Sequence, residues 1–392
     1  MSKLDWALLI VTALVAISGY IEGFVLGACA TIGLLGGAAL GVWGVPKILD
    51  NFSPSVSVSF AALVLVVLLA SIGRTLGALI GSRVRNKLSW KPIRFLDALG
   101  GAALAAASVL IVAWVLGVAV SGARIPSVTS AVRGSQVLAK TDEVLPNSAD
   151  RALQSFNDVV NTDLFPRFLD PFVPERIRET QPPDSAIARQ QSVRDAYSRI
   201  AKVTGVASCS RGLEGSGFVY APKRVMTNAH VVAGVSSPQV EVGGKKYDAK
   251  VVVFDPETDI AVLYVKDLSE SVKPLAFDLT GKADDAAVVL GYPENGPFDS
   301  EPARIRSEER LRGPDIYGDK TVTREAFSIW ASVRPGNSGG PLLSSKGVVY
   351  GVVFAASVED NRTGYVLTAQ QVAADARAGS TATQEVSTQS CT

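Results

Sequence analysis

Three short motifs hold the side chains best suited to chemistry. His230 lies in Thr-Asn-Ala-His-Val-Val, Asp259 begins Asp-Ile-Ala-Val-Leu, and Ser338 lies in Gly-Asn-Ser-Gly-Gly-Pro. A serine hydroxyl is a weak nucleophile until a neighbouring base accepts its proton, and histidine does so near neutral pH. A carboxylate can hold that imidazole in the correct tautomer. The three residues therefore predict nucleophilic acyl transfer by a Ser-His-Asp triad.

His230 is the only histidine in the 392-residue chain, so any imidazole chemistry must depend on it. A metal site built on two or more histidines is excluded within one chain, and we expect neither metal nor cofactor. The net charge of +1 argues against a nucleic-acid binder that works through bulk electrostatics. Each motif alone has a structural alternative, namely a packed histidine, a surface carboxylate or a simple turn. Their order and their positions on predicted strands favour catalysis.

The glycines around the serine predict an oxyanion hole formed by Gly336, Asn337 and Ser338. Gly336 lets a turn expose backbone N–H groups without a Cβ in the way. The N–H groups of Gly336 and Ser338 are the expected donors, and one such donor contributes about 3 kcal/mol to transition-state stabilisation.

These motifs must be positioned by the β-rich part of the chain, which begins near residue 203. Short apolar, often β-branched segments separated by turns predict two sets of about six strands. The first set covers 203–208, 217–221, 224–228, 239–242, 247–254 and 260–265, and the second covers 286–292, 303–308, 326–333, 341–343, 348–355 and 364–368. The expected architecture of this part is an all-β pair of six-stranded barrels, and the spacing of its strands resembles the chymotrypsin fold.

The three motifs resemble those of trypsin-like proteases, and the Asp259 run resembles the HtrA-like branch. The resemblance implies a specificity pocket with Ser332 at its base, since this residue lies six before the nucleophile, and Phe354, Ala355 and Ala356 along one wall. Ser332 is uncharged and so predicts no preference for Arg or Lys. Digestive-type relatives carry Asp where this chain has Asn337, so activation by a newly formed N-terminal amine is not expected.

Residues 1–122 have the composition of a membrane domain, with 8 Lys/Arg and 4 Asp/Glu against 30 and 33 in the remainder. Apolar runs at about 6–20, 24–45, 56–72 (or on to 80) and 98–120 predict a four-helix transmembrane bundle. The loop after the third run is basic, which predicts a cytoplasmic loop and places everything after residue 120 outside the cytoplasm. The hydropathy pattern and this loop resemble the colicin V production family.

Two features of the membrane domain have alternative interpretations. Gly33, Gly37 and Gly41 form a small-residue stripe that would pack helices closely, either within this bundle or between two chains. Arg74 is an intramembrane charge if the third span is long. We expect instead that the span ends at Ile72 and that the arginine reaches the interface.

Residues 123–190 form the predicted linker, and 191–392 the predicted protease domain. Short helices are expected at 148–162 and from Ser192 to about residue 203, with a further one at 368–378. A proline-rich tether beside a protease is also a candidate for self-cleavage.

Cys209 and Cys391 bracket the protease domain. In an oxidising compartment they predict one intramolecular disulfide, with an intermolecular bridge or two free thiols as alternatives. Cys29 lies in a membrane run and is expected to be a small buried residue.

The whole architecture resembles the MarP-type, acid-resistance serine proteases of actinobacteria, which are anchored in the inner membrane with the protease domain in the periplasm. This resemblance implies cleavage of cell-envelope proteins, such as peptidoglycan hydrolases, during acid and oxidative stress. Two other classes stay open from the sequence: a membrane transporter or channel whose protease-like domain is a sensor, and a catalytically silent scaffold that binds envelope peptides.

Overall fold

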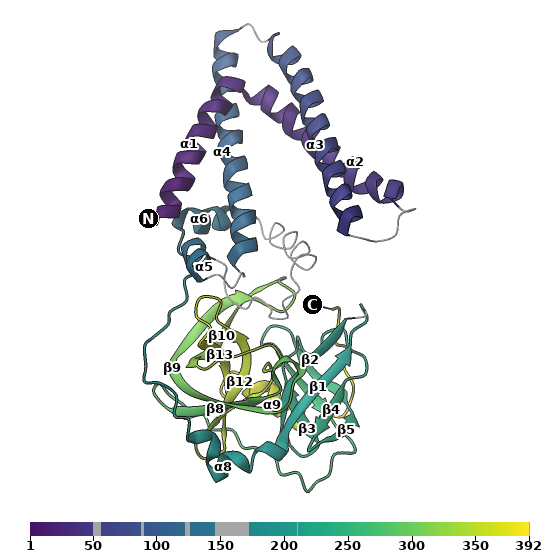
Figure 1. The fold of residues 1–392 in the computed structure, drawn as a ribbon, viewed down its shortest axis with the longest axis vertical. Helices are drawn as coiled ribbons and strands as arrows, with labels where there is room; N and C mark the ends of the chain where they lie inside the picture. The colour runs from purple at the N-terminus through teal and green to yellow at the C-terminus, as the bar shows by residue number, and fades with distance from the viewer. Residues whose placement is uncertain (50–55, 88–89, 122–125, 146–171, 210, 392) are drawn as a thin grey trace. The chain divides into compact units, whose positions relative to one another are not determined.

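The computed structural model describes residues 1–49, 56–87, 90–121, 126–145, 172–209 and 211–391 (Figure 1). The chain divides into two compact units. The first comprises Met1–Gly117 and Ser135–Leu145, and the second comprises Val118–Gly134 and Pro146–Thr392. The helix predicted at 148–162 lies outside the described residues.

The first unit contains four helices that are long and apolar enough to cross a membrane. They are α1 (Lys3–Glu22), α2 (Phe24–Leu49), α3 (Val56–Arg85) and α4 (Lys91–Ser121). Two short helices follow, α5 (Pro126–Arg133) in the second unit and α6 (Gln136–Val144) in the first. The four predicted apolar helices are therefore present. The third helix continues through Ile72 to Arg85, past the predicted end of the membrane span.

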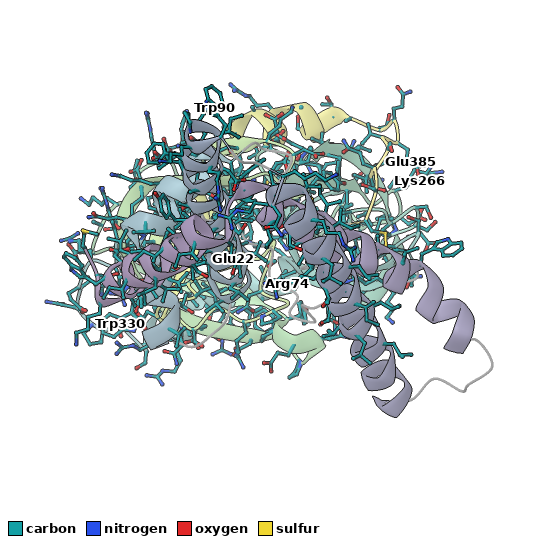
Figure 2. All side chains as sticks on the ribbon, turned by 90° about the horizontal axis from the view of Figure 1, so that it is seen from above. Glu22, Arg74, Trp90, Lys266, Trp330 and Glu385 are labelled. Carbon is teal, nitrogen blue, oxygen red and sulfur yellow. A yellow bond between two sulfur atoms is a disulfide. The ribbon has the colours of Figure 1, made fainter. Side chains whose placement is uncertain are left out.

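Arg74 consequently lies well inside α3, where its side chain is exposed, while Glu22 ends α1 (Figure 2). The carboxylate of Asp97 in α4 is buried. It accepts hydrogen bonds from Arg85 Nε at 2.9 Å and from the Val25 backbone N–H at 2.8 Å. This carboxylate ties α4 to α3 and to the start of α2.

The α6 helix packs on α1 through a buried carboxylate. Asp5 Oδ1 accepts hydrogen bonds from Ser135 Oγ at 2.6 Å and from the Val137 backbone at 3.2 Å, while Asp5 and Ser2 form a capping box at the start of α1. These bonds anchor the start of α6, a segment that the sequence places in the linker.

Helices α2 and α3 run side by side and pack through glycines on both helices (Figure 1). A Cβ added to Gly33 would lie 2.1 Å from the Gly73 carbonyl oxygen, and one added to Gly37 would lie 2.3 Å from that of Leu69. Only residues without a side chain allow this approach. Two glycines of the predicted stripe therefore pack a helix pair within one chain.

We expect Gly33→Leu to destabilise the α2–α3 pair by about 1–3 kcal/mol, because an inserted side chain forces two packed backbones apart. An SDS unfolding titration of the full chain in mixed micelles measures this loss. Gly36→Leu is the matched control, since a Cβ there meets nothing within 4 Å. Equal loss in both variants would contradict the packing argument.

After α5, the described part of the second unit continues with short helical turns and two β-sheets. The turns are η1 (Ile187–Arg189), α8 (Gln191–Arg194) and η2 (Tyr197–Arg199). The first sheet contains β1 (Ile200–Val206), β2 (Gly212–Ala221), β3 (Arg224–Thr227), β4 (Gln239–Val242), β5 (Lys245–Asp248), β6 (Lys250–Asp255) and β7 (Ile260–Tyr264). Its order is β5-β4-β1-β2-β3-β7-β6.

This first sheet has seven strands where the sequence predicted six. The predicted strand 247–254 is divided at Ala249, whose N–H donates to the Pro238 carbonyl at 3.1 Å. The two halves, β5 and β6, are the opposite edge strands of the sheet. Since one residue joins them, the sheet must curl until its edges approach each other.

The second sheet is a closed six-stranded barrel of order β10-β13-β12-β11-β8-β9. Its strands are β8 (Ala286–Gly291), β9 (Asp299–Pro314), β10 (Thr321–Trp330), β11 (Pro341–Ser344), β12 (Val349–Ala356) and β13 (Thr363–Thr368), and η3 (Pro293–Asn295) follows β8. Each sheet encloses its own apolar cluster, and a larger cluster containing Phe218, Ile260, Leu290 and Phe354 joins the two. The shared core holds the sheets together as the scaffold of one site.

The predicted helix from Ser192 is wrong beyond its first turn. Ser192 Oγ donates to the Ser345 carbonyl at 2.6 Å instead of capping a helix, and β1 already begins at Ile200. The terminal helix α9 (Ala373–Thr381) lies a few residues later than predicted and packs on β7 and β6. A disulfide joins Cys209 to Cys391, with 6.4 Å between the Cα atoms, and fixes the C-terminal tail beside the first sheet.

Asp375 of α9 is partly buried near Asp255 and Tyr220. Burial, reinforced by the Asp255 carboxylate, raises the pKa of Asp375 to about 6. When folding raises the pKa of a carboxyl group, the protonated group contributes to the stability of the folded state. This contribution is complete below the pKa of the unfolded chain, near 4, and is lost as the pH rises through about 6. The protease unit should therefore gain stability from this group as the pH falls.

Asp375→Asn is expected to stabilise the protease unit by about 1 kcal/mol at pH 7.5, after allowance for solvent screening, and to leave it unchanged near pH 4. Thermal midpoints of the full chain between pH 4 and 8 measure the difference. Asp267→Asn, which changes an exposed carboxylate, is the control. A pH-independent effect of Asp375→Asn would refute the assignment.

Candidate active site

His230 and Asp259 are brought together at the ends of two paired strands of the first sheet. His230 follows β3, and Asp259 immediately precedes β7, which pairs with β3. His230 Nδ1 lies 2.8 Å from Asp259 Oδ2, and the His230 backbone N–H donates to Oδ1 at 3.0 Å. Asp259 is fully buried and His230 is 8 % exposed. A carboxylate facing Nδ1 favours the tautomer protonated there, which makes Nε2 the proton-accepting nitrogen.

Asp259 adopts a left-handed backbone conformation, with φ of 65°. Its carbonyl oxygen accepts a hydrogen bond from Asn228 Nδ2 at 2.8 Å. A non-glycine residue with positive φ persists only where its surroundings fix it. The loop is therefore held from both sides so that its carboxylate faces the imidazole.

Ser338 lies in a tight turn between β10 and β11 and is almost buried. The Ser216 backbone N–H donates to the Ser338 carbonyl at 2.8 Å. A Cβ added to Gly215 would lie 2.6 Å from Val231 Cγ2 and 3.0 Å from the Ser338 carbonyl oxygen. Gly215 thus contacts both the nucleophile turn and the residue after His230, so the structure brings Ser338 into the neighbourhood of the His-Asp pair.

The same turn presents two backbone donors. Among the described residues, neither the Gly336 nor the Ser338 N–H donates a hydrogen bond to another group. Gly336 has φ of 88°, and a Cβ there would lie 2.4 Å from the Tyr292 carbonyl oxygen. Only glycine fits this conformation, which leaves both N–H groups able to bind a developing oxyanion.

Asn337 does not belong to the predicted oxyanion hole as a donor. Its backbone N–H donates to the Arg334 carbonyl at 3.0 Å, and its own carbonyl accepts from the Gly340 N–H at 2.9 Å. These bonds close the turn, so Asn337 shapes the hole without contributing to it.

The predicted pocket residues have unequal exposure. Phe354 is fully buried in the core shared by the two sheets, and Ala355 is nearly buried, so neither side chain can line a pocket wall. Ala356 is half-buried and pairs with Gly364 of β13. Ser332 is also half-buried, and its N–H points to Glu301 Oε1 at 3.4 Å. A carboxylate therefore lies beside the predicted base of the pocket.

Ser216 was not predicted as a site residue. It is buried, and its hydroxyl is hydrogen-bonded to two residues of the second-sheet region. Its hydroxyl donates to the Gly336 carbonyl at 2.6 Å and accepts from the Tyr292 N–H at 2.8 Å. These bonds fix the Gly336–Asn337 peptide, which directly follows the Gly336 N–H. The small residues on both sides of Ser216, Gly215 and Gly217, were the available signal for a close approach of two backbones.

Arg324 of β10 was also missed. The residue is 1 % exposed, and its guanidinium donates to the Glu257 carbonyl at 2.8 Å and to the Pro314 carbonyl at 3.0 Å. Burial lowers the pKa of Arg324, while the nearby Asp259 carboxylate opposes that shift. The second sheet therefore supplies a buried cation near the carboxylate that faces His230.

This two-sheet fold, with His230, Asp259 and Ser338 gathered between the sheets, defines the class of trypsin-like serine proteases. The described residues contain no cluster of three or more His, Cys, Asp or Glu side chains able to hold a metal.

The comparisons with known proteins agree with this class. A family model described as trypsin-like peptidase domain matches residues 215–352, and one described as colicin V production protein matches residues 4–146. Serine protease Rv3671c of Mycobacterium tuberculosis is 40% identical over 99% of this chain and 98% of its own length. The crystal structure of the active form of that protease superposes with a TM-score of 0.54 at 45% identity, over 57% of this chain and 99% of the crystallised one. The HtrA protease of Lactococcus lactis is 33% identical over 45% of this chain and 46% of its own length.

The chain therefore belongs to the Rv3671c family of serine proteases, and it joins a colicin V production-like region to a trypsin-like domain. The predicted fold class and the predicted enzyme class are both confirmed.

Proposed function

We propose that the chain is an extracytoplasmic serine endopeptidase in which Ser338 is the nucleophile, His230 the general base and Asp259 the residue that orients it. The observation that carries this proposal is the buried 2.8 Å contact between His230 Nδ1 and Asp259 Oδ2, next to a turn with two available N–H donors. Few structural roles require a buried carboxylate and an imidazole beside such a turn.

The residues would act in a fixed order. Ser338 Oγ attacks the scissile carbonyl while His230 Nε2 accepts its proton and Asp259 stabilises the imidazolium. The oxyanion that forms binds the N–H groups of Gly336 and Ser338. His230 then protonates the leaving amine, and water hydrolyses the acyl-enzyme by the same steps.

Fluorophosphonate labelling of the full chain tests this assignment. The wild-type chain should label and cleave members of a peptide library, and Ser338→Ala should do neither. A chain that neither labels nor cleaves would favour the sensor interpretation. A Ser338→Ala variant that still cleaves peptides would place the nucleophile elsewhere.

The expected orientation rests on the basic loop between α3 and α4. This region carries Arg83, Arg85, Lys87, Lys91 and Arg94. Short loops of this charge stay in the cytoplasm, so α4 would deliver the protease unit to the outer side of the inner membrane. In spheroplasts, a tag added after residue 392 should be digested by external protease, and protection of the tag would reverse the orientation.

The proposed substrates are cell-envelope proteins, such as peptidoglycan hydrolases, cleaved during acid and oxidative stress. Support comes from the resemblance to MarP-type proteases and from the proposed extracytoplasmic orientation. Cleavage of the chain's own linker is proposed as well. N-terminal sequencing of the wild-type chain and of Ser338→Ala after incubation separates self-cleavage from the action of other proteases.

A further inference from the structure

Residues of the segment that precedes the protease fold contact the loop between β12 and β13, residues 357–362. Arg133, the last residue of α5, has a side chain that is only 4% exposed. Its Nε lies 3.0 Å from Glu359 Oε1 in that loop, and its Nε and Nη2 both donate to the Val173 carbonyl, at 3.1 and 2.8 Å. A buried guanidinium is tolerated only with such partners, so this contact holds α5 and residue 173 on the loop.

Glu175 makes a second attachment two residues further on. Its Oε1 accepts from the Val358 backbone N–H at 3.1 Å, and its Oε2 accepts from the Tyr365 hydroxyl at 2.7 Å. The Glu175 N–H donates to Glu359 Oε1 at 3.3 Å. One side chain therefore joins the loop to the buried tyrosine of β13.

The charges in this cluster depend on one another. Burial raises the pKa of Glu359, the nearby Glu175 carboxylate raises it further, and Arg133 lowers it. Without Arg133, two neighbouring carboxylates would remain in a partly buried site. We expect their repulsion to displace the loop.

The strands that this loop connects support the turn of the proposed nucleophile. Tyr365 pairs with Ala355 across β12 and β13. Two residues earlier on β12, the Val353 carbonyl accepts from the Gly339 N–H at 2.8 Å, and the Val353 N–H donates to the Gly340 carbonyl at 2.9 Å. The loop therefore directly follows β12, the strand that is hydrogen-bonded to Gly339 and Gly340, the two residues after Ser338.

We propose that Arg133 and Glu175 are positioning residues for peptide cleavage, which hold β12 and β13 in the arrangement that supports the Ser338 turn. This inference rests on the proposed role of Ser338. It makes the activity of the protease unit depend on side chains that the sequence places in a linker. A cut between residues 133 and 175 would separate the two, leaving Glu175 with the protease and Arg133 with the membrane helices.

The test uses the full chain in detergent micelles, with kcat and KM for one peptide substrate, the rate of fluorophosphonate labelling and the thermal midpoint as readouts. Arg133→Met and Glu175→Gln should each lower kcat and the labelling rate about tenfold, with little change in KM, as expected for coupled residues. In Arg133→Met/Glu359→Gln, most of the rate should return, because the uncompensated carboxylate is gone. Arg189→Met, an exposed arginine of the same segment, is the control and should match the wild type.

Wild-type kcat in both Arg133→Met and Glu175→Gln would overturn the inference. So would rate losses that only follow a lowered thermal midpoint and are not recovered in the double variant. Failure of the proposed function is distinguishable, since the wild-type chain itself would then neither label nor cleave.

Discussion

Asp259→Asn is expected to lower kcat for peptide cleavage by about 10⁴-fold while leaving the fold intact. The carboxylate accepts from His230 Nδ1 at 2.8 Å and from the His230 backbone N–H at 3.0 Å. An asparagine of the same shape keeps one acceptor oxygen for the backbone bond and turns its NH₂ group toward Nδ1. The imidazole must then carry its proton on Nε2, where it cannot accept one from Ser338.

The same substitution removes the buried negative charge that would stabilise the imidazolium during proton transfer. Steady-state kinetics of the full chain, with active-site titration to count competent molecules, measures the loss. Asp267→Asn changes an exposed carboxylate of the first-sheet region and should retain wild-type kcat. If Asp259→Asn loses less than about tenfold, Asp259 does not set the tautomer of His230.

The parts of the fold and site that the sequence predicts well are those specified by neighbouring residues. The motif around Ser338 contains its own glycines, and two of them, Gly336 and Gly339, take the positive φ angles that the turn requires. Short apolar, often β-branched runs likewise predict most strands, because several strands, such as β3, β11 and β13, are buried along their whole length. His230 and Asp259 could be paired from sequence because each lies in a short motif that resembles those of trypsin-like proteases, and the structure then places them at the ends of paired strands.

The features that escaped prediction depend on residues distant in the chain. Ser192 looks like a helix cap, but its hydroxyl bonds Ser345, and the Gly347 backbone packs against it. In the sequence, Arg324 has the pattern of an ordinary charged residue on a strand. Only the fold shows that the Glu257 carbonyl lies beside it. Local propensity is a weak prior that tertiary contacts override. The contact of Arg133 with Glu359 has no local signal at all.

Gly336→Ala is expected to lower kcat by about 10²–10³-fold, the loss typical of removing one oxyanion-hole donor. The residue has φ of 88°, and an added Cβ would lie 2.4 Å from the Tyr292 carbonyl oxygen and 2.9 Å from the Glu294 nitrogen. Both obstacles are backbone atoms, so the alanine peptide must rotate or shift. Its N–H would then no longer point toward the position that the oxyanion occupies.

Gly347→Ala provides a control of matched strain outside the site. Gly347 has φ of 75°, and its added Cβ would lie 2.4 Å from the Ser192 carbonyl oxygen. Both variants should therefore lose stability, whereas only Gly336→Ala should lose kcat. A comparable loss of kcat in the two variants would mean that general strain, and not the position of one N–H, limits the reaction.

A peptide boronate separates the ground state from the transition state in the same pair of variants. The boronate forms a tetrahedral adduct with a nucleophilic serine, and one of its oxygens takes the place of the oxyanion. Its affinity for Gly336→Ala should fall by the same factor as kcat/KM, because both depend on a donor used only by the tetrahedral species. KM for the peptide should change little, since the planar carbonyl gains less from that donor. An unchanged boronate affinity alongside a reduced kcat would show that Gly336 acts on a step other than oxyanion formation.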